Sequence, residues 1–150
     1  MIQRIQHLYF GFVIINLSIL LSGLEIGTYQ AKELPHQFTI YGFFQGKEVV
    51  WGFPFYLVII ALVALLIFTI SKFKKLSLQL KLIKFAFLFY LLFVVGITAL
   101  FLFKLMPNVP DSVSFGLGYY LLIIGLPFTY LGLRGIIRDK NLLDSYNRLR

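Results

Sequence analysis

Residues 85–103 read FAFLFYLLFVVGITALFLF, a run without a single Asp, Glu, Lys or Arg. Three other runs share this property and lie at residues 5–24, 49–71 and 112–133. Each run has roughly 19–23 residues, which as an α-helix measures roughly 28–35 Å and matches the hydrocarbon core of a bilayer. Because backbone amides in lipid need partners within their own segment, we expect each run to be a transmembrane helix.

The composition of the whole chain indicates the same class of protein. Of its 150 residues, 59% are hydrophobic and 13% are charged, and the mean hydropathy is +0.87. A water-soluble domain contains about 45–50% apolar and about 25% charged residues, so an ordinary soluble domain is excluded. The sequence predicts one domain over residues 1–150, an all-α integral membrane protein built as a four-helix bundle. Its transmembrane helices are expected at about 5–24, 51–71, 82–103 and 112–134.

Basic residues are distributed unevenly between the two sides of these predicted helices. The amino end, the loop 72–84 and the tail from residue 134 hold 11 of the 14 Lys and Arg, and the outer loops hold the other three. Cytoplasmic loops of membrane proteins are enriched in Lys and Arg, so we expect both termini in the cytoplasm. Anionic lipid headgroups at that face are the expected partners of these charges. The same explanation makes the basic isoelectric point poor evidence for nucleic-acid binding.

The longest loop, residues 25–48, lies between the first two predicted helices. Residues 38–44 read FTIYGFF and are followed by QG and then KEVV. Aromatic and β-branched residues around a glycine-containing turn are typical of a β-hairpin. We therefore expect a short extracytoplasmic hairpin here, with residues 27–31 as a candidate third strand.

Residues 135–149 are predicted to form an amphipathic tail helix in the cytoplasm. Leu142, Tyr146 and Leu149 recur at helical spacing, and Leu143 widens the apolar face. Such a face is typical of a helix that lies on a membrane surface or binds a partner. These four residues are therefore candidates for contact with a membrane-protein partner.

Three glycines recur every seven residues in the last predicted span, at Gly118, Gly125 and Gly132. Small residues at such spacing let another helix approach closely. The stripe is a second candidate for partner binding, and packing within the chain explains it equally well.

The sequence carries no motif of a known catalytic site. It contains no cysteine and two histidines, which excludes thiolate ligands and multi-histidine metal sites. We therefore expect neither an enzyme nor a bound cofactor or metal. One alternative polar site combines Asn16, Glu25 and His36 near the outer end of the first helix. Asn16 also suits a hydrogen bond between helices, and Glu25 suits a charge at a helix end.

Three segments on the predicted cytoplasmic side read MIQRIQHLY at 1–9, KKLSLQLK at 74–81 and RDKNLLDSYNRLR at 138–150. Together they resemble a domain-of-unknown-function family of small four-helix inner-membrane proteins from Gram-negative bacteria. The resemblance implies a multi-pass protein of the bacterial inner membrane and supplies no activity. It also implies a polar cluster where the two termini meet, which either closes the bundle by salt bridges or forms a docking surface. The cluster consists of Arg4, Arg138, Asp139, Ser145, Arg148 and Arg150.

The sequence supports two functional hypotheses. The first is a non-catalytic accessory subunit that stabilises a larger inner-membrane complex, and it is motivated by the lack of catalytic motifs, the glycine stripe and the amphipathic tail. The second is a transporter or membrane enzyme that handles a small molecule or a lipid at the alternative polar site. This second hypothesis requires Asn16, Glu25 and His36 to converge on one pocket.

Overall fold

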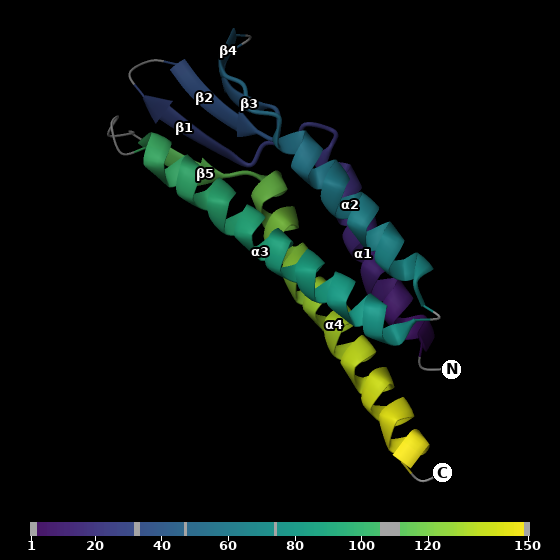
Figure 1. Cartoon of the computed structure of the whole chain (residues 1–150). Helices are drawn as coiled ribbons and strands as arrows, with labels where there is room; N and C mark the ends of the chain where they lie inside the picture. Colours follow the sequence, from purple (N-terminus) through teal and green to yellow (C-terminus); the bar gives the residue numbers. More distant parts are fainter. Residues whose placement is uncertain (1–2, 32–33, 47, 74, 106–111, 149–150) are drawn as a thin grey trace.

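The computed structural model describes residues 3–31, 34–46, 48–73, 75–105 and 112–148. Within these residues the chain forms four helices and a five-stranded sheet (Figure 1). The helices are α1 (Gln3–Leu20), α2 (Phe55–Ser71), α3 (Leu76–Leu105) and α4 (Leu117–Arg148). The strands are β1 (Gly27–Ala31), β2 (Leu34–Thr39), β3 (Gly42–Gln45), β4 (Glu48–Trp51) and β5 (Ser112–Phe115).

The expectation of an all-α protein with one short hairpin is wrong, because the five strands form an antiparallel sheet. Its strand order is β4-β3-β2-β1-β5, so β1 lies between β2 and β5. Thr28 and Ser114 pair across β1 and β5, and their hydroxyl oxygens lie 2.5 Å apart. We expected residues 112–115 to begin a helix. Pairing with β1 instead satisfies their backbone hydrogen bonds.

The expectation of four membrane-spanning helices is wrong as well. Within the described residues, two helices are long and apolar enough to cross a membrane, over Leu76–Phe103 and Leu117–Ser145. The apolar parts of the other two helices, Ile5–Leu20 and Phe55–Ser71, are shorter.

The two shorter helices fall short because their charge-free runs do not stay helical throughout. α1 ends at Leu20, and the turn that follows contains Gly23 with a positive φ of 86°. At the start of the second predicted helix, Trp51 belongs to β4, and α2 begins only at Phe55. An absence of charge therefore did not distinguish helix from turn or strand at these two ends.

The sheet and the two chain termini lie at opposite ends of an elongated molecule (Figure 1). Helices α1 and α4 pack side by side, and α3 also packs against α4. The predicted tail helix is the continuation of α4, which runs unbroken with Pro127 inside it. The last turns of α4 project beyond the other helices in Figure 1.

Aromatic side chains join the sheet to the helices. The ring of Phe38 in β2 lies 5.7 Å from that of Phe101 in α3 and 5.9 Å from that of Phe55 in α2, centre to centre. Its neighbour in β3, Phe43, stacks on it at 4.3 Å. All four residues are buried, so this cluster anchors the sheet on the ends of α2 and α3.

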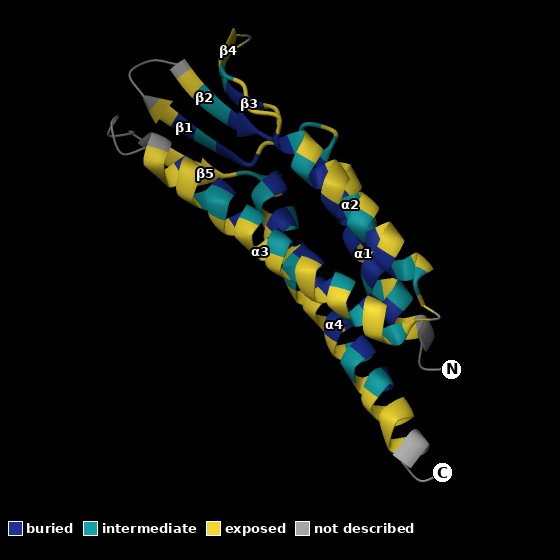
Figure 2. Ribbon diagram, in the orientation of Figure 1, coloured by how far each residue is buried: buried dark blue, intermediate teal, exposed yellow. Residues whose placement is uncertain are grey.

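The outward faces of the helices are apolar. Figure 2 shows exposed positions along each helix, and these include Leu8 of α1, Phe103 of α3 and Leu117 of α4, which are 71%, 70% and 72% exposed. Large apolar side chains are therefore exposed on all four helices.

Candidate functional site

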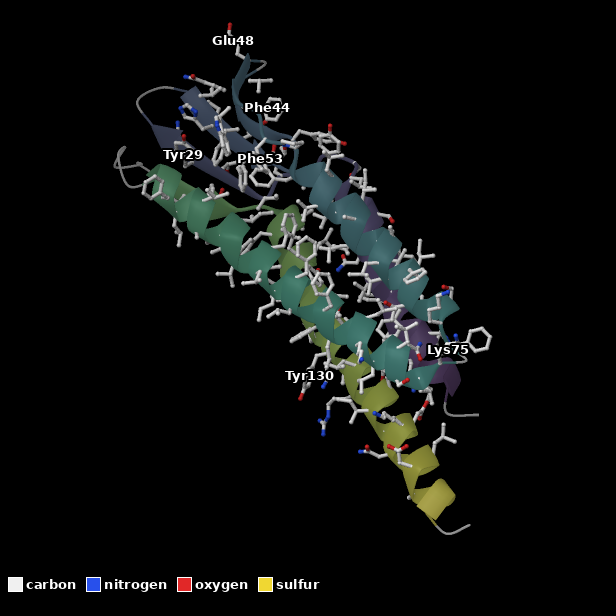
Figure 3. The ribbon with its side chains drawn as sticks, viewed as in Figure 1. Tyr29, Phe44, Glu48, Phe53, Lys75 and Tyr130 are labelled. Carbon is white, nitrogen blue, oxygen red and sulfur yellow. The ribbon has the colours of Figure 1, made fainter. Side chains whose placement is uncertain are left out.

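An open groove lies between α1 and α4, toward the end of the molecule that carries the termini. Its volume is about 850 Å³, which is within the range of small-molecule sites. Figure 3 shows Tyr130, one of its lining residues, on the opposite part of the molecule from Tyr29 and Glu48 of the sheet. The lining residues are Ile5, Gln6, Tyr9, Tyr130, Leu131, Arg134, Gly135, Ile137, Arg138, Asn141 and Leu142.

A buried polar pair joins the two helices at this groove. The Nε2 group of Gln6 donates a hydrogen bond to Oδ2 of Asp139, and both residues are buried. Gln6 also lies against Gly135, where a Cβ atom would overlap its side chain. Because a buried carboxylate is costly without a hydrogen-bond partner, this pair helps to fix α1 against α4.

Two arginines present positive charge in the groove. Arg134 and Arg138 are exposed, and their spacing places them on the same face of α4. The Cζ atom of Arg134 lies 6.0 Å from the centre of the Tyr130 ring, within the range of a cation–π contact. Neither guanidinium forms an ion pair with another side chain that the structure describes. The groove therefore offers two cationic groups to an anion.

A different pair, of a buried tyrosine and a half-buried histidine, lies at the sheet end. Tyr29 and His36 stack across β1 and β2 with ring centres 4.7 Å apart and planes 6° apart. Burial raises the pKa of Tyr29 above its ordinary value of 10.0. The Nδ1 atom of His36 is buried and has no hydrogen-bond partner in the described part of the chain. No group of three His, Asp or Glu side chains suited to a metal ion occurs among the residues that the structure describes.

The structure does not bring together Asn16, Glu25 and His36, the three residues of the alternative polar site. Asn16 is buried in α1 and donates a hydrogen bond of 2.8 Å to the carbonyl oxygen of Leu121 in α4. Glu25 is exposed in the link between α1 and β1, and its carbonyl oxygen accepts a hydrogen bond from the N–H group of Gly118. His36 stacks on Tyr29 in the sheet. The three side chains therefore have three separate environments.

The glycine stripe of α4 faces other parts of the same chain. A Cβ atom at Gly118 would lie too close to the Glu25 carbonyl group, one at Gly125 would overlap the Tyr90 hydroxyl, and one at Gly132 would overlap the Phe10 ring. The Tyr90 hydroxyl in turn donates a hydrogen bond of 2.9 Å to the carbonyl oxygen of Leu122. These contacts place the stripe inside the packing of the chain, so it presents no open surface to a foreign helix.

The apolar tail positions are exposed where the structure describes them. Leu142 and Leu143 are each 50% exposed, and Leu142 also lines the groove. Tyr146 belongs to α4, but its side chain lies outside the described part of the structure, and Leu149 lies outside the described residues.

The polar cluster that the resemblance implied is only partly described. Arg138 is exposed in the groove, whereas Asp139 points into the contact with Gln6. The Oγ atom of Ser145 donates a hydrogen bond of 2.8 Å to the carbonyl oxygen of Leu142 in its own helix. The side chains of Arg4 and Arg148, and all of Arg150, lie outside the description.

Sequence reasoning missed most residues of the groove, including Gln6, Tyr9, Tyr130 and Arg134. A partial signal existed, because Arg134 and Arg138 stand four residues apart at the point where the apolar run of α4 ends. The groove forms because α1 packs against α4 beside these two arginines. This packing is tertiary, so no local sequence pattern predicts it.

The fold and the groove define a small protein with two helices able to cross a membrane, a sheet at one end and a cationic groove toward the other. Residues 2–149 match the model of the family described as "Domain of unknown function (DUF4293)", and the chain belongs to that family. The resemblance to a domain-of-unknown-function family is therefore confirmed. Comparison with curated proteins finds no match, and comparison with solved structures finds none either.

Proposed function

We propose that the protein is a multi-pass protein of the bacterial inner membrane, with α3 and α4 crossing the bilayer. The length and apolar character of these two helices support the proposal. In this arrangement lipid covers the exposed apolar faces of α3 and α4, and the shorter α1 and α2 pack against these two helices and run beside them between the two ends of the molecule. The resemblance to an inner-membrane family supports the bacterial compartment.

The proposed orientation puts the end with both termini in the cytoplasm and the sheet outside it. Lys72, Lys75, Lys81 and Lys84 surround the turn between α2 and α3, and Arg134 and Arg138 follow the apolar part of α4. Figure 3 shows Lys75 far from Glu48, the acidic residue that begins β4 at the sheet end. Enrichment of basic residues on one side supports a cytoplasmic location for that side.

The proposed role is that of a non-catalytic accessory subunit whose tail contacts a larger membrane assembly. The single observation that carries this role is the exposure of Leu142 and Leu143 on the projecting part of α4. Both follow Arg134, where the apolar run of the helix has ended. Complete burial of a leucine contributes roughly 1.5–3 kcal/mol, and these two leucines are half exposed, so a protein surface that covers them would add about half of that for each.

Site-specific photocrosslinking in native membranes tests this role. A photoreactive amino acid at Leu143 is expected to give a protein adduct of one reproducible mass. The matched control carries the same amino acid at Leu92 of α3, which is 61% exposed in the middle of an apolar helix and is expected to contact lipid. Absence of a protein adduct at Leu143, or the same adduct at both positions, would contradict a specific contact through the tail.

A further inference from the structure

We propose that the groove between α1 and α4 binds the phosphate headgroup of an anionic phospholipid from the cytoplasmic leaflet. Arg134 and Arg138 hold the phosphate, and the apolar lining accommodates the beginning of an acyl chain. This site goes beyond the tail contact, but it rests on the proposed membrane orientation.

The charge of the groove selects an anion. Arg134 and Arg138 project from the same face of α4, and neither is paired with a carboxylate among the described side chains. The nearest acidic neighbour in the helix, Asp139, is buried and accepts its hydrogen bond from Gln6 on the inner side of the groove. Guanidinium groups bind phosphate or carboxylate oxygens through two parallel hydrogen bonds, and two guanidinium groups together can contact several oxygens of one phosphate.

Neutral polar groups complete the headgroup region. Tyr9, Tyr130 and Asn141 line the same groove and carry hydroxyl or amide donors. The contact between Arg134 and the Tyr130 ring restricts the guanidinium at the edge of the groove. A partly fixed arginine loses less conformational entropy when it binds a ligand.

The position of the groove selects a lipid rather than a soluble phosphate compound. The apolar run of α4 ends at Leu133, and the charge-free run of α1 begins at Ile5, so the groove spans the level at which both helices leave the apolar layer. Ile5 and Leu131 line it and are 54% and 41% exposed. A ligand with a charged phosphate and an attached hydrocarbon chain matches both parts of this lining.

Native mass spectrometry of the full chain in detergent tests the proposal by titration with phosphatidylglycerol and, separately, phosphatidylcholine. We expect the wild type to retain phosphatidylglycerol in preference to phosphatidylcholine. The double variant Arg134→Gln/Arg138→Gln should bind phosphatidylglycerol about tenfold more weakly, because it loses charge-assisted hydrogen bonds to the phosphate. The control Lys75→Gln/Lys81→Gln removes the same charge from exposed positions outside the groove and should change the affinity less than about twofold.

One further variant separates charge from geometry, and a competition experiment separates lipid from free phosphate. Arg134→Lys/Arg138→Lys keeps the charge but loses the planar guanidinium, so we expect an intermediate affinity. Inorganic phosphate in millimolar excess should leave lipid retention unchanged. The proposal would be overturned if Arg134→Gln/Arg138→Gln and the control Lys75→Gln/Lys81→Gln lost the same affinity for phosphatidylglycerol. Displacement of the lipid by inorganic phosphate would also overturn it. If the chain fractionates with membranes but shows no preference for phosphatidylglycerol, the lipid site is contradicted and the proposed membrane location is not. Recovery of the chain in the soluble fraction would contradict the proposed membrane location itself.

Discussion

Gly132 of α4 packs against the ring of Phe10 in α1, so a methyl group at this position has no room. We expect Gly132→Ala to lower the free energy of unfolding by about 1–3 kcal/mol, because overpacking forces the two helices apart. The matched control is Gly96→Ala in α3, where a Cβ atom meets nothing within 4 Å. The control should be neutral or more stable by about 0.5–1 kcal/mol. Denaturation in detergent micelles measures both values, and equal effects would show that the α1–α4 contact is not close.

Tyr29 makes the stability of the sheet sensitive to alkaline pH. Burial raises its pKa above 10.0 in the folded protein, whereas the unfolded chain keeps the ordinary value. The folded state therefore holds the phenol proton more tightly, so this contribution is complete below pH 10 and is lost as the pH rises beyond it, by at most about 1.4 kcal/mol per pH unit. Denaturation at pH 8 and pH 11 should show a smaller alkaline loss in Tyr29→Phe than in the wild type. The same loss in both proteins would assign it to other groups.

The strand β5 depends on one glycine at its junction with α4. The N–H group of Gly116 donates a hydrogen bond of 2.9 Å to the carbonyl oxygen of Ile26, and a Cβ atom at Gly116 would overlap the Glu25 carbonyl group. We expect Gly116→Ala to detach β5 from β1 and to speed hydrogen exchange of their paired amides about tenfold or more, which corresponds to about 1.4 kcal/mol. Gly52→Ala is the control, because its Cβ atom would meet Val49 at an ordinary 3.6 Å. Unchanged exchange in β1 and β5 would show that the junction tolerates the extra atom.

At the level of elements, the sequence identified the long apolar helices better than the sheet. The charge-free run at 85–103 lies inside α3, because an uninterrupted apolar run of this length has few alternatives to a helix. Residues 112–115 read SVSF and are equally free of charge, yet they form β5. Their partner strand begins at Gly27, far away in the sequence. A local pattern cannot reveal a pairing of this kind.

At the scale of the whole molecule, the groove also combines a feature that the sequence predicts with one that depends on tertiary packing. The basic residues after the apolar part of α4 could be predicted to face the cytoplasmic headgroups from their order in the sequence. Their arrangement beside Gln6 and Tyr9 depends on the packing of α1 against α4, which brings together residues more than a hundred positions apart. The alternative polar site required Asn16, Glu25 and His36 to converge, whereas their described contacts are with Leu121, Gly118 and Tyr29 respectively.

Chemical labelling tests most directly whether the sheet and the termini face opposite sides of a membrane. The chain contains no cysteine, so single cysteines can be introduced at the exposed positions Glu48 and Lys75 without a competing background. Labelling with a membrane-impermeant maleimide is carried out on intact spheroplasts and again after lysis. We expect the Glu48→Cys variant to react before lysis and the Lys75→Cys variant to react only after it. Reaction of both variants before lysis, or of neither, would contradict the proposed membrane arrangement.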